Sequence, residues 1–179
     1  MRATAWRAKI RAMPALLVRA AVPADAAEIA AIYNEGIADR VATFETRERT
    51  AEEVRAWLDD ALPFIVATVD DGVVGWARVA PYSDRCVYAG VGEHGVYVAR
   101  AARGHRVGRR LLDELCLAAE AAGLYKLTSR IFADNESSIA AHTAAGFDVV
   151  GVQRRHGRLD GEWKDCVLVE RLIGDAAAG

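Results

Sequence analysis

The apolar side chains of this chain recur at two intervals, and each interval predicts one kind of element. Over residues 107–122 they recur at the spacing of one helix face. Residues 64–69 and 73–80 are instead short apolar runs rich in β-branched side chains, with Asp71-Gly72 between them. Because that dipeptide is typical of tight turns, the pattern predicts a β-hairpin.

Polar residues mark where further helices begin and end. Asp25 with Glu28, and Thr50 with Glu53, have the spacing of capping boxes, in which side chains satisfy the first free N–H groups of a helix. Pro63 blocks continuation of the second of these helices. We therefore predict, in chain order, a strand, two helices, three strands, a helix, a strand, a helix and two strands. The strands are expected over residues 16–20, 64–69, 73–80, 93–99, 126–132, 147–154 and 163–171, and the later helices over 107–122 and 136–145, closed by Gly123 and Gly146.

This order predicts an α/β fold, with a mixed sheet and helices on both of its faces. The 179 residues suffice for one domain and are short for two. We expect that domain to span residues 16–173, between a disordered leader, 1–15, and a frayed tail, 174–179. The Arg-rich start lacks the apolar stretch of a secretory signal. A start codon assigned too early, with Met13 as the true first residue, and a short amphipathic targeting peptide are the alternatives to a leader.

Composition and charge exclude several classes of protein. Hydrophobic residues make up 53% and charged residues 27%, which excludes a disordered chain. No apolar run reaches the ~18 residues that cross a bilayer. With 23 Lys+Arg against 25 Asp+Glu the formal net charge is −2, whereas a protein that binds bulk nucleic acid is normally more basic. Cys86, Cys116 and Cys166 are odd in number and lack metal-ligand spacing, so we expect no disulfide framework, no metal and a cytoplasmic protein.

The strongest chemical signal is the turn R-G-H-R-V-G at residues 103–108, which joins a predicted strand to a predicted helix. The first N–H groups of a helix have no partner within the helix and can bind phosphate. Gly104 and Gly108 permit close approach, and the arginines add charged contacts. We predict a phosphate-binding turn; an ordinary turn with a solvated basic face is the alternative. The sequence contains neither the P-loop motif nor the glycine motif of dinucleotide-binding folds.

Two further features lie close to this turn. Asn135 and His142 are seven residues apart on the next helix, which places them on nearly the same face. Taken singly, they would be an ordinary cap and an ordinary packing residue. Glu93 precedes the turn on a strand face that it shares with Gly95 and Tyr97. A carboxylate there is a candidate general base toward an amine, and an exposed strand-end charge is the alternative.

Together these segments resemble the GNAT acetyltransferases, which transfer acetyl from acetyl-CoA to an amine. Residues 103–108 correspond to the family motif Q/R-x-x-G-x-G/A, except that Arg106 replaces the first glycine. Within the family the chain is most similar to the phosphinothricin and arsinothricin N-acetyltransferases. The similar segments are I-Y-N-E-G-I (32–37), T-F-E-T (43–46), A-P-Y-S-D-R-C-V-Y (80–88), E-H-G-V-Y-V (93–98), H-T-A-A-G-F (142–147) and H-G-R-L-D-G-E-W-K-D (156–165). The resemblance covers residues 17–173 and implies a GNAT-like, mostly antiparallel sheet.

The resemblance also implies roles for particular residues. Glu93 matches the family's base, and His142 stands where many GNAT enzymes have a tyrosine that protonates the leaving group. Acetyl-CoA contacts are implied for Val96, Tyr97, Val98, Arg103, Gly104, His105, Arg106, Val107, Gly108, Arg109, Asn135 and Ser138. Substrate contacts are implied for Phe44, Arg85, Tyr88 and Tyr97. Ser83 stands where phosphinothricin enzymes often have a lysine, a departure that bears on which amino acid is the substrate.

We therefore predict an acetyl-CoA-dependent N-acetyltransferase that acetylates the α-amino group of a small amino-acid-like substrate by direct transfer, in detoxification or resistance. Phosphinothricin, arsinothricin, methionine sulfone and methionine sulfoximine are the candidate substrates. Because the family is commonly dimeric, we expect a homodimer, and no nucleic-acid or membrane partner. An acetyltransferase for peptide or protein N-termini and a non-catalytic acyl-CoA-binding sensor are the alternatives.

Overall fold

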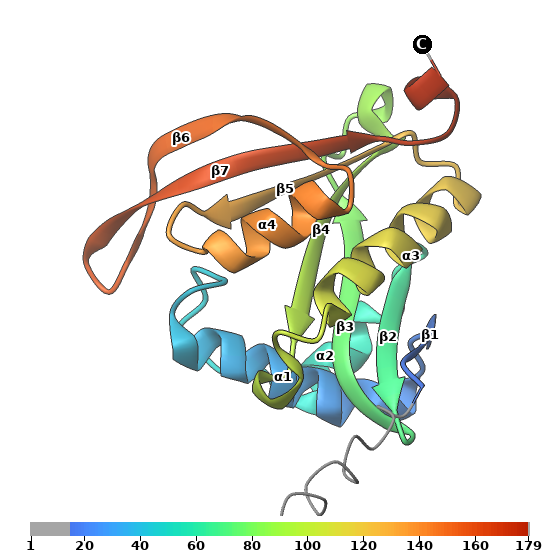
Figure 1. Ribbon diagram of the computed structural model, residues 1–179, viewed down its shortest axis with the longest axis vertical. Coiled ribbons are helices and arrows are strands. Elements are labelled where there is room, and N and C mark those ends of the chain that lie inside the picture. Colours follow the sequence, from blue (N-terminus) through green and yellow to red (C-terminus); the bar gives the residue numbers. More distant parts are fainter. Residues whose placement is uncertain (1–14, 179) are drawn as a thin grey trace, which may run out of the picture.

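A seven-stranded sheet forms the centre of the molecule, as the computed structural model shows for residues 15–178 (Figure 1). The strand order is β1-β2-β3-β4-β5-β7-β6. Neighbouring strands are antiparallel except β4 and β5, which are parallel, so the predicted mixed, mostly antiparallel sheet is confirmed. The strands are β1 (Leu17–Ala20), β2 (Phe64–Val69), β3 (Gly72–Pro81), β4 (Val91–Val98), β5 (Lys126–Phe132), β6 (Asp148–Leu159) and β7 (Glu162–Leu172).

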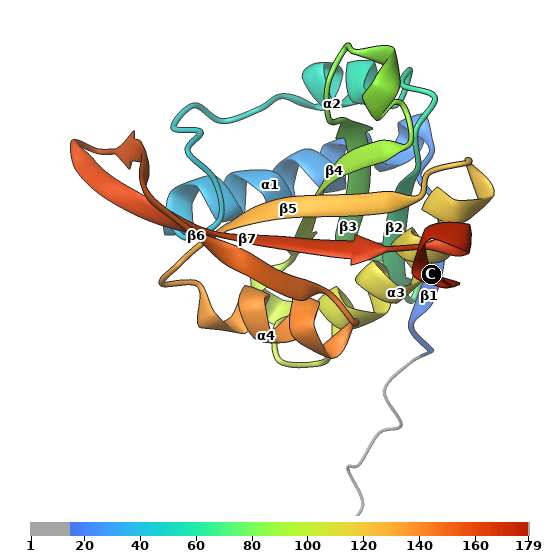
Figure 2. The same cartoon turned by 90° about the horizontal axis from the view of Figure 1, so that it is seen from above.

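Helices cover both faces of this sheet, as the sequence predicts (Figure 2). On one face lie α1 (Ala26–Asp39) and α2 (Ala51–Trp57), and on the other lie α3 (Val107–Ala121) and α4 (Glu136–Ala144). Short 3₁₀ helices occupy Pro23–Asp25, Cys86–Tyr88, Arg100–Ala102 and Gly174–Ala178. The order of strands and α-helices along the chain is the predicted one.

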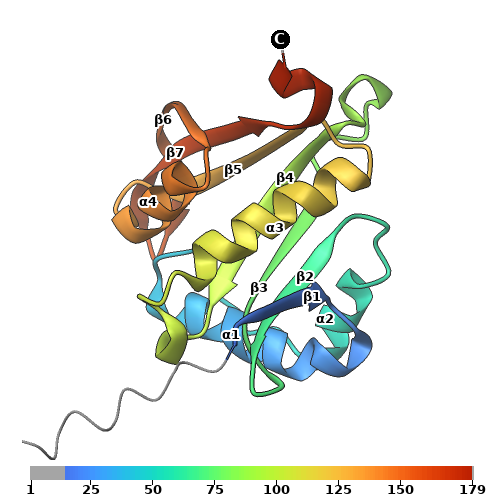
Figure 3. The ribbon, with the colours of Figure 1, turned by 45° about the vertical axis from the view of Figure 1, so that its right-hand side comes forward.

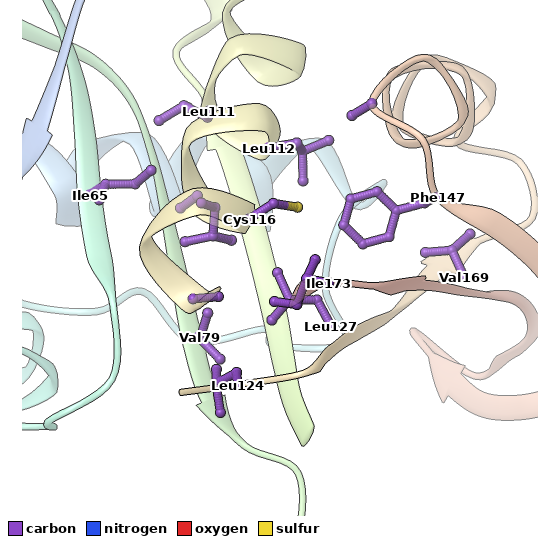
Figure 4. Packing of buried hydrophobic residues seen from close by; sticks show 14 of the residues in the cluster. Ile65, Val79, Leu111, Leu112, Cys116, Leu124, Leu127, Phe147, Val169 and Ile173 are labelled. Atoms are coloured by element: carbon purple, nitrogen blue, oxygen red, sulfur yellow. The ribbon is translucent and has the colours of Figure 1, made fainter. Parts of the chain in front are cut away.

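Each face has its own hydrophobic core. Under α3 and α4, Leu111, Leu112 and Leu115 are fully buried in one cluster that includes Phe147. Figure 4 shows Leu112 on the side of Phe147 and Leu111 on the side of Ile65. Under α1 and α2, a smaller core gathers around Trp76. Because a fully buried leucine contributes about 1.5–3 kcal/mol, the apolar stripe of α3 is a main source of the stability of this helix.

The predicted capping box of α1 is wrong, because tertiary partners take both of its carboxylates. Asp25 pairs with Arg19, at 2.7 and 2.8 Å, and also accepts a hydrogen bond from the Val22 N–H. Glu28 accepts from the backbone N–H of Val73, which lies 45 residues away in the sequence. Asp25 and Glu28 have the spacing of a capping box, but each carboxylate binds another partner that the spacing does not indicate.

Two other local predictions have opposite outcomes. The capping box of α2 is confirmed, since Thr50 accepts from the Glu53 N–H at 3.2 Å and Glu53 accepts from the Thr50 N–H at 2.8 Å. The hairpin between β2 and β3 forms, but its turn is shifted by one residue. Asp70 and Asp71 have positive φ angles, and Gly72 already belongs to β3. Asp tolerates this left-handed conformation, so the glycine is not required within the turn itself.

The ends of the chain can be compared with prediction only in part. The expected leader falls almost entirely on residues 1–14, which lie outside the described residues. At the other end, a 3₁₀ helix occupies Gly174–Ala178, where the sequence predicts a frayed tail. It follows Ile173, whose side chain is buried and whose N–H bonds the Tyr125 carbonyl. Within residues 15–178, no helix is long and apolar enough to cross a membrane.

The feature that matters most for function is a split in the sheet between β4 and β5. These strands pair only over Val91–Glu93, opposite Lys126–Thr128. Beyond that point β4 continues along β3 to Val98, while β5 continues along β7 to Phe132. The two strands diverge, as Figures 1 and 3 show. The edge of β4 that faces the opening therefore has no strand partner from residue 94 onward.

Candidate active site

A cleft of about 1220 Å³ occupies this split in the sheet. Its walls come from β4, β5, the first turn of α3, one side of α4 and the segment 41–46 that follows α1. A volume of this size exceeds that of most single-ligand pockets, roughly 300–1000 Å³. The cleft can therefore hold two molecules at once.

Side chains of β4 reach this cleft from opposite faces of the sheet. Val96 and Val98 pack with the core under α3, whereas Tyr97 packs with the core under α1 and stacks on Trp76 at a centroid distance of 4.6 Å. Because side chains alternate along a strand, Glu93 shares the face of Tyr97, and His94 shares the face of Val96. The cleft thus has an α1 side and an α3 side, which meet where β4 and β5 part.

On the α1 side, Glu93 forms an ion pair with Arg130 of β5. Nη1 of Arg130 donates to Oε1 of Glu93 at 2.6 Å, and both residues line the cleft. The side chain of Glu93 is about 40% exposed, and its Oε2 makes no hydrogen bond to any described residue. Glu93 therefore presents a free carboxylate oxygen at the opening of the sheet, as a general base requires.

On the α3 side, His142 lies buried in α4 with both ring nitrogens bonded to protein atoms. Nδ1 lies 2.7 Å from the Ser138 carbonyl, and Nε2 lies 3.0 Å from Nε2 of His94. A carbonyl oxygen only accepts, so Nδ1 of His142 holds the proton. In the neutral ring Nε2 then accepts, and His94 must be the donor between the two rings. This leaves Nδ1 of His94 buried and without a hydrogen-bond partner among the described residues.

Burial keeps this histidine pair neutral. It lowers the pKa of His94, and the proximity of His142 lowers that pKa further. Burial also lowers the pKa of His142, against the effect of the hydrogen bond to the Ser138 carbonyl. In this state His142 offers no N–H to the cleft. The expected role of His142 as proton donor to a leaving group stays a prediction, and it requires one of these hydrogen bonds to break.

The turn before α3, where the sequence predicts a phosphate site, lies at the same side of the cleft. Arg106 is the N-cap of α3 and adopts a left-handed backbone, with φ 62° and ψ 15°. Gly104 has φ 80°, and a Cβ there would meet no atom within 4 Å, so the chain is open on that side. The first residues of α3, whose N–H groups have no partner within the helix, line the cleft here.

The arginines around this turn differ in what they already bind. Arg103 donates to Asp39 at 2.7 Å and to the Val98 carbonyl at 3.1 Å, so its guanidinium ties the turn to α1. Arg109 lies 3.6 Å from Asp113 on the same helix. Arg106 forms no ion pair with any of residues 15–178, and its guanidinium is available to a ligand. Of these three arginines, Arg103 is thus the one whose side chain holds the turn in place.

Asn135 and Ser138 close the cleft beside α4. Oδ1 of Asn135 accepts from the Ser138 N–H at 3.1 Å and caps α4, and its Nδ2 donates to the Val41 carbonyl at 2.9 Å. The second bond fixes the segment 41–46 over the cleft. Phe44 of that segment packs edge-on against Phe132, at a centroid distance of 4.7 Å.

Most of the predicted site residues are brought together in this cleft, and three are not. Arg85 and Tyr88 lie on the loop between β3 and β4, where the guanidinium sits 5.5 Å from the centre of the tyrosine ring, and neither lines the cleft. His105 is exposed on the turn and also lies outside the cleft. The predicted residues that line the cleft are Glu93, His142, Val96, Tyr97, Val98, Arg103, Gly104, Arg106, Val107, Gly108, Arg109, Asn135, Ser138 and Phe44.

Among the charged and polar cleft residues that sequence reasoning missed, His94 and Arg130 directly contact the predicted catalytic residues His142 and Glu93. His94 directly follows Glu93, and strand alternation could have placed it on the face of His142. Arg130 carries no local signal, because a single arginine in a strand is ordinary. As for metals, residues 15–178 contain no group of three His, Cys, Asp or Glu side chains arranged to hold an ion.

Comparison with known proteins gives the class of this protein. Residues 18–168 match the family model described as an acetyltransferase (GNAT) domain. The chain therefore belongs to the GNAT acetyltransferases, and it is an acyltransferase.

Its named relatives narrow this class. A phosphinothricin N-acetyltransferase from Alcaligenes faecalis is 34% identical over 164 residues, which cover 89% of this chain and 83% of that protein. An L-methionine sulfoximine/L-methionine sulfone acetyltransferase from Pseudomonas paraeruginosa is 30% identical over 158 residues, covering 86% and 92%. A crystal structure of a phosphinothricin acetyltransferase from Sinorhizobium meliloti in complex with acetyl-CoA is 30% identical, with a TM-score of 0.85 and coverage of 92% and 91%.

Proposed function

We propose that this protein acetylates the α-amino group of a small amino-acid-like substrate, with acetyl-CoA as acetyl donor. One observation carries the proposal. A single cleft passes through the sheet, with the free carboxylate oxygen of Glu93 on one side and the start of α3 on the other. The names of the relatives, which refer to acetylation of phosphinothricin and of methionine derivatives, support the substrate class.

The residues around α3 fit the phosphate groups of acetyl-CoA. The free N–H groups of the first helical turn would bind the pyrophosphate, at the positive end of the helix dipole. Arg106 and Arg109 line the cleft beside this turn and would add charge-assisted contacts. Val96 and Val98 would lie along the pantetheine chain, beside the unpaired edge of β4.

The protein's part in the reaction would be to orient two molecules and move one proton. Acetyl-CoA supplies an acetyl group activated as a thioester. Oε2 of Glu93, directly or through a water, would take a proton from the substrate ammonium, because only the neutral amine is nucleophilic. Backbone N–H groups on the free edge of β4 would stabilise negative charge on the reacting oxygen.

Arg85 and Tyr88 remain proposed substrate contacts. A guanidinium suits a carboxylate or a phosphinate, but both side chains lie outside the cleft in the single chain. Replacing Arg85 by Ala should raise the KM for the amino acid and leave the KM for acetyl-CoA unchanged. If only the acetyl-CoA KM rises, Arg85 is not a substrate contact.

We also propose a homodimer that works in a reducing, cytoplasmic setting, in detoxification or resistance. Free thiols at Cys86, Cys116 and Cys166 support a reducing compartment. The edge strand β6 exposes three valines, which a second copy of the chain would cover: Val149, Val150 and Val152. A resistance role is supported by the relatives named for phosphinothricin.

Release of free thiol from acetyl-CoA tests the proposed function. The amines to compare are phosphinothricin, arsinothricin, methionine sulfone, methionine sulfoximine, glutamate, an aminoglycoside and a short peptide. Turnover confined to the tetrahedral or pyramidal amino-acid analogues supports the proposal. Turnover of the peptide alone assigns the protein to acetylation of peptide N-termini, and acetyl-CoA binding without turnover of any amine assigns it to acyl-CoA sensing.

A further inference from the structure

Arg130 is a charged residue of the cleft that the proposed reaction does not use. Its Nη1 donates to Glu93 at 2.6 Å, and its Nε donates to Oε1 of Gln153 on β6 at 3.2 Å. These two bonds fix the plane of the guanidinium. No hydrogen bond joins its Nη2 to any residue between 15 and 178, and the side chain is 31% exposed at the cleft. A guanidinium is thus oriented by two partners and has one donor group left over.

The position of this donor group matches the shape of an α-amino acid. In such a substrate a single carbon separates the amine from the carboxylate, so the groups that bind them must also be neighbours. Glu93 and Arg130 are such neighbours, in direct contact on the same side of the cleft. With the ammonium at Oε2 of Glu93, the carboxylate would lie at Nη2 of Arg130. The substrate ammonium and carboxylate would then each pair with the opposite charge of the Glu93–Arg130 ion pair.

Charge leads to the same conclusion. A carboxylate entering beside Glu93 alone would be repelled, because two like charges would meet in a partly enclosed site. Arg130 compensates Glu93 and supplies the donors that a carboxylate requires. The other arginines of the cleft belong to the turn and first residues of α3, on the side proposed for acetyl-CoA: Arg103, Arg106 and Arg109.

We propose that Arg130 binds the α-carboxylate of the substrate and so restricts the enzyme to free amino acids. The inference rests on the proposed function and makes it narrower. A peptide has no carboxylate next to its N-terminal amine, so it would leave Arg130 without a partner. Arg130 would thus exclude peptide and protein N-termini by chemistry, independently of how wide the cleft is.

The test compares L-methionine sulfone with its α-carboxamide, by thiol release from acetyl-CoA. The wild-type protein should prefer the free acid by about 10- to 150-fold in kcat/KM, the range expected for one charge-assisted hydrogen-bonded contact. Arg130→Gln should remove this preference by lowering kcat/KM for the acid only. Because both substrates meet the same Glu93 in each variant, any general effect on the base cancels in the ratio. Arg130→Lys keeps the positive charge but loses the paired N–H donors of the guanidinium, so it should keep part of the preference for the free acid.

Arg110→Gln is the matched control, since Arg110 lies outside the cleft and pairs with Glu114 on α3. It should leave the ratio unchanged, and an unchanged KM for acetyl-CoA shows that each variant is folded. Equal losses for acid and amide in Arg130→Gln would assign Arg130 to positioning Glu93 and overturn the inference. A wild-type protein that acetylates both compounds equally would overturn it too, while leaving the proposed function intact. Failure to acetylate any amino acid would overturn the proposed function itself.

Discussion

His94 donates a hydrogen bond from its Nε2 to Nε2 of His142, 3.0 Å away, and so connects β4 to α4 across the buried α3 side of the cleft. The direction of this bond follows from the carbonyl of Ser138, which requires the other nitrogen of His142 to carry the proton. One backbone oxygen thereby fixes the tautomers of two rings. The pair is adjacent in space although 48 residues separate its members in the sequence.

The first prediction concerns these tautomers. At pH 7 we expect His142 to be protonated at Nδ1 only and His94 at Nε2 only. Two-bond nitrogen–proton NMR correlations of the imidazole rings distinguish the two forms. The exposed ring of His105 provides an internal reference for an unconstrained histidine. If His142 is instead protonated at Nε2, His142 donates the hydrogen bond between the rings and His94 accepts it. That result would contradict the prediction.

The second prediction is a loss of stability in mildly acidic solution. Folding lowers the pKa of both His94 and His142 below the usual value of 6.5. As the pH falls through 6.5, the unfolded chain binds protons that the folded protein does not bind. The free energy of unfolding therefore decreases as the pH falls below 6.5, by up to about 1.4 kcal/mol per pH unit for each histidine, and is level above it.

Urea unfolding at pH 7.5, 6.5 and 5.5 measures this dependence. A double variant, His94→Gln with His142→Gln, should be nearly level over the same range, because it lacks both titrating groups. Carboxylates do not disturb the comparison, since they titrate mainly below pH 5. A wild-type protein equally stable at pH 7.5 and 5.5 would contradict the prediction.

The third prediction concerns the base. Glu93→Gln keeps the size of the side chain and an oxygen for Arg130, but it cannot accept a proton. We expect kcat to fall by about 10²–10⁴-fold, with little change in the affinity for acetyl-CoA. Steady-state kinetics with the best amino-acid substrate measures both quantities. An unchanged kcat would exclude Glu93 as the base.

The fourth prediction separates the two properties of Arg106, its charge and its backbone. Arg106→Gly and Arg106→Ala both remove the guanidinium, so both should raise the KM for acetyl-CoA. Only glycine adopts the left-handed conformation of this N-cap without steric cost. The glycine variant should therefore be more stable than the alanine variant by about 1 kcal/mol, as measured by urea unfolding. Equal stability of the two variants would show that the turn relaxes when its side chain is removed.

The strength of the periodic signals explains how much of the fold could be predicted. The sequence predicts strands 64–69 and 126–132 to the residue. The first is an apolar run, and the second lies between the helix-ending Gly123 and the capping residue Asn135. The last two strands extend beyond prediction to Leu159 and Glu162, since an Asp160-Gly161 turn with positive φ angles continues their pairing. The local pattern fails where a side chain has a partner distant in the sequence, as Glu28 has in the N–H of Val73.

The site was predicted in a similarly uneven way. Motif residues on β4 and at the start of α3 were found, because a strand, a turn and a helix are contiguous in sequence. Arg130 was not found, because its neighbour Glu93 is 37 residues away and the two meet only through the parallel pairing of β4 with β5. For His94, strand alternation indicates the face of β4, whereas its contact with His142 depends on how α4 packs on the sheet. A sequence pattern gives the face of a strand, but not which strand lies beside it.

The split between β4 and β5 has a consequence for the order of events. A continuous sheet would separate the two faces of the molecule. Here side chains from both faces line one cleft, among them Tyr97 on the α1 side and His142 on the α3 side. Both reactants can therefore be present at the same time, so the proposed transfer needs no covalent intermediate on the enzyme. Double-reciprocal plots at several fixed concentrations of the second reactant should accordingly intersect rather than run parallel.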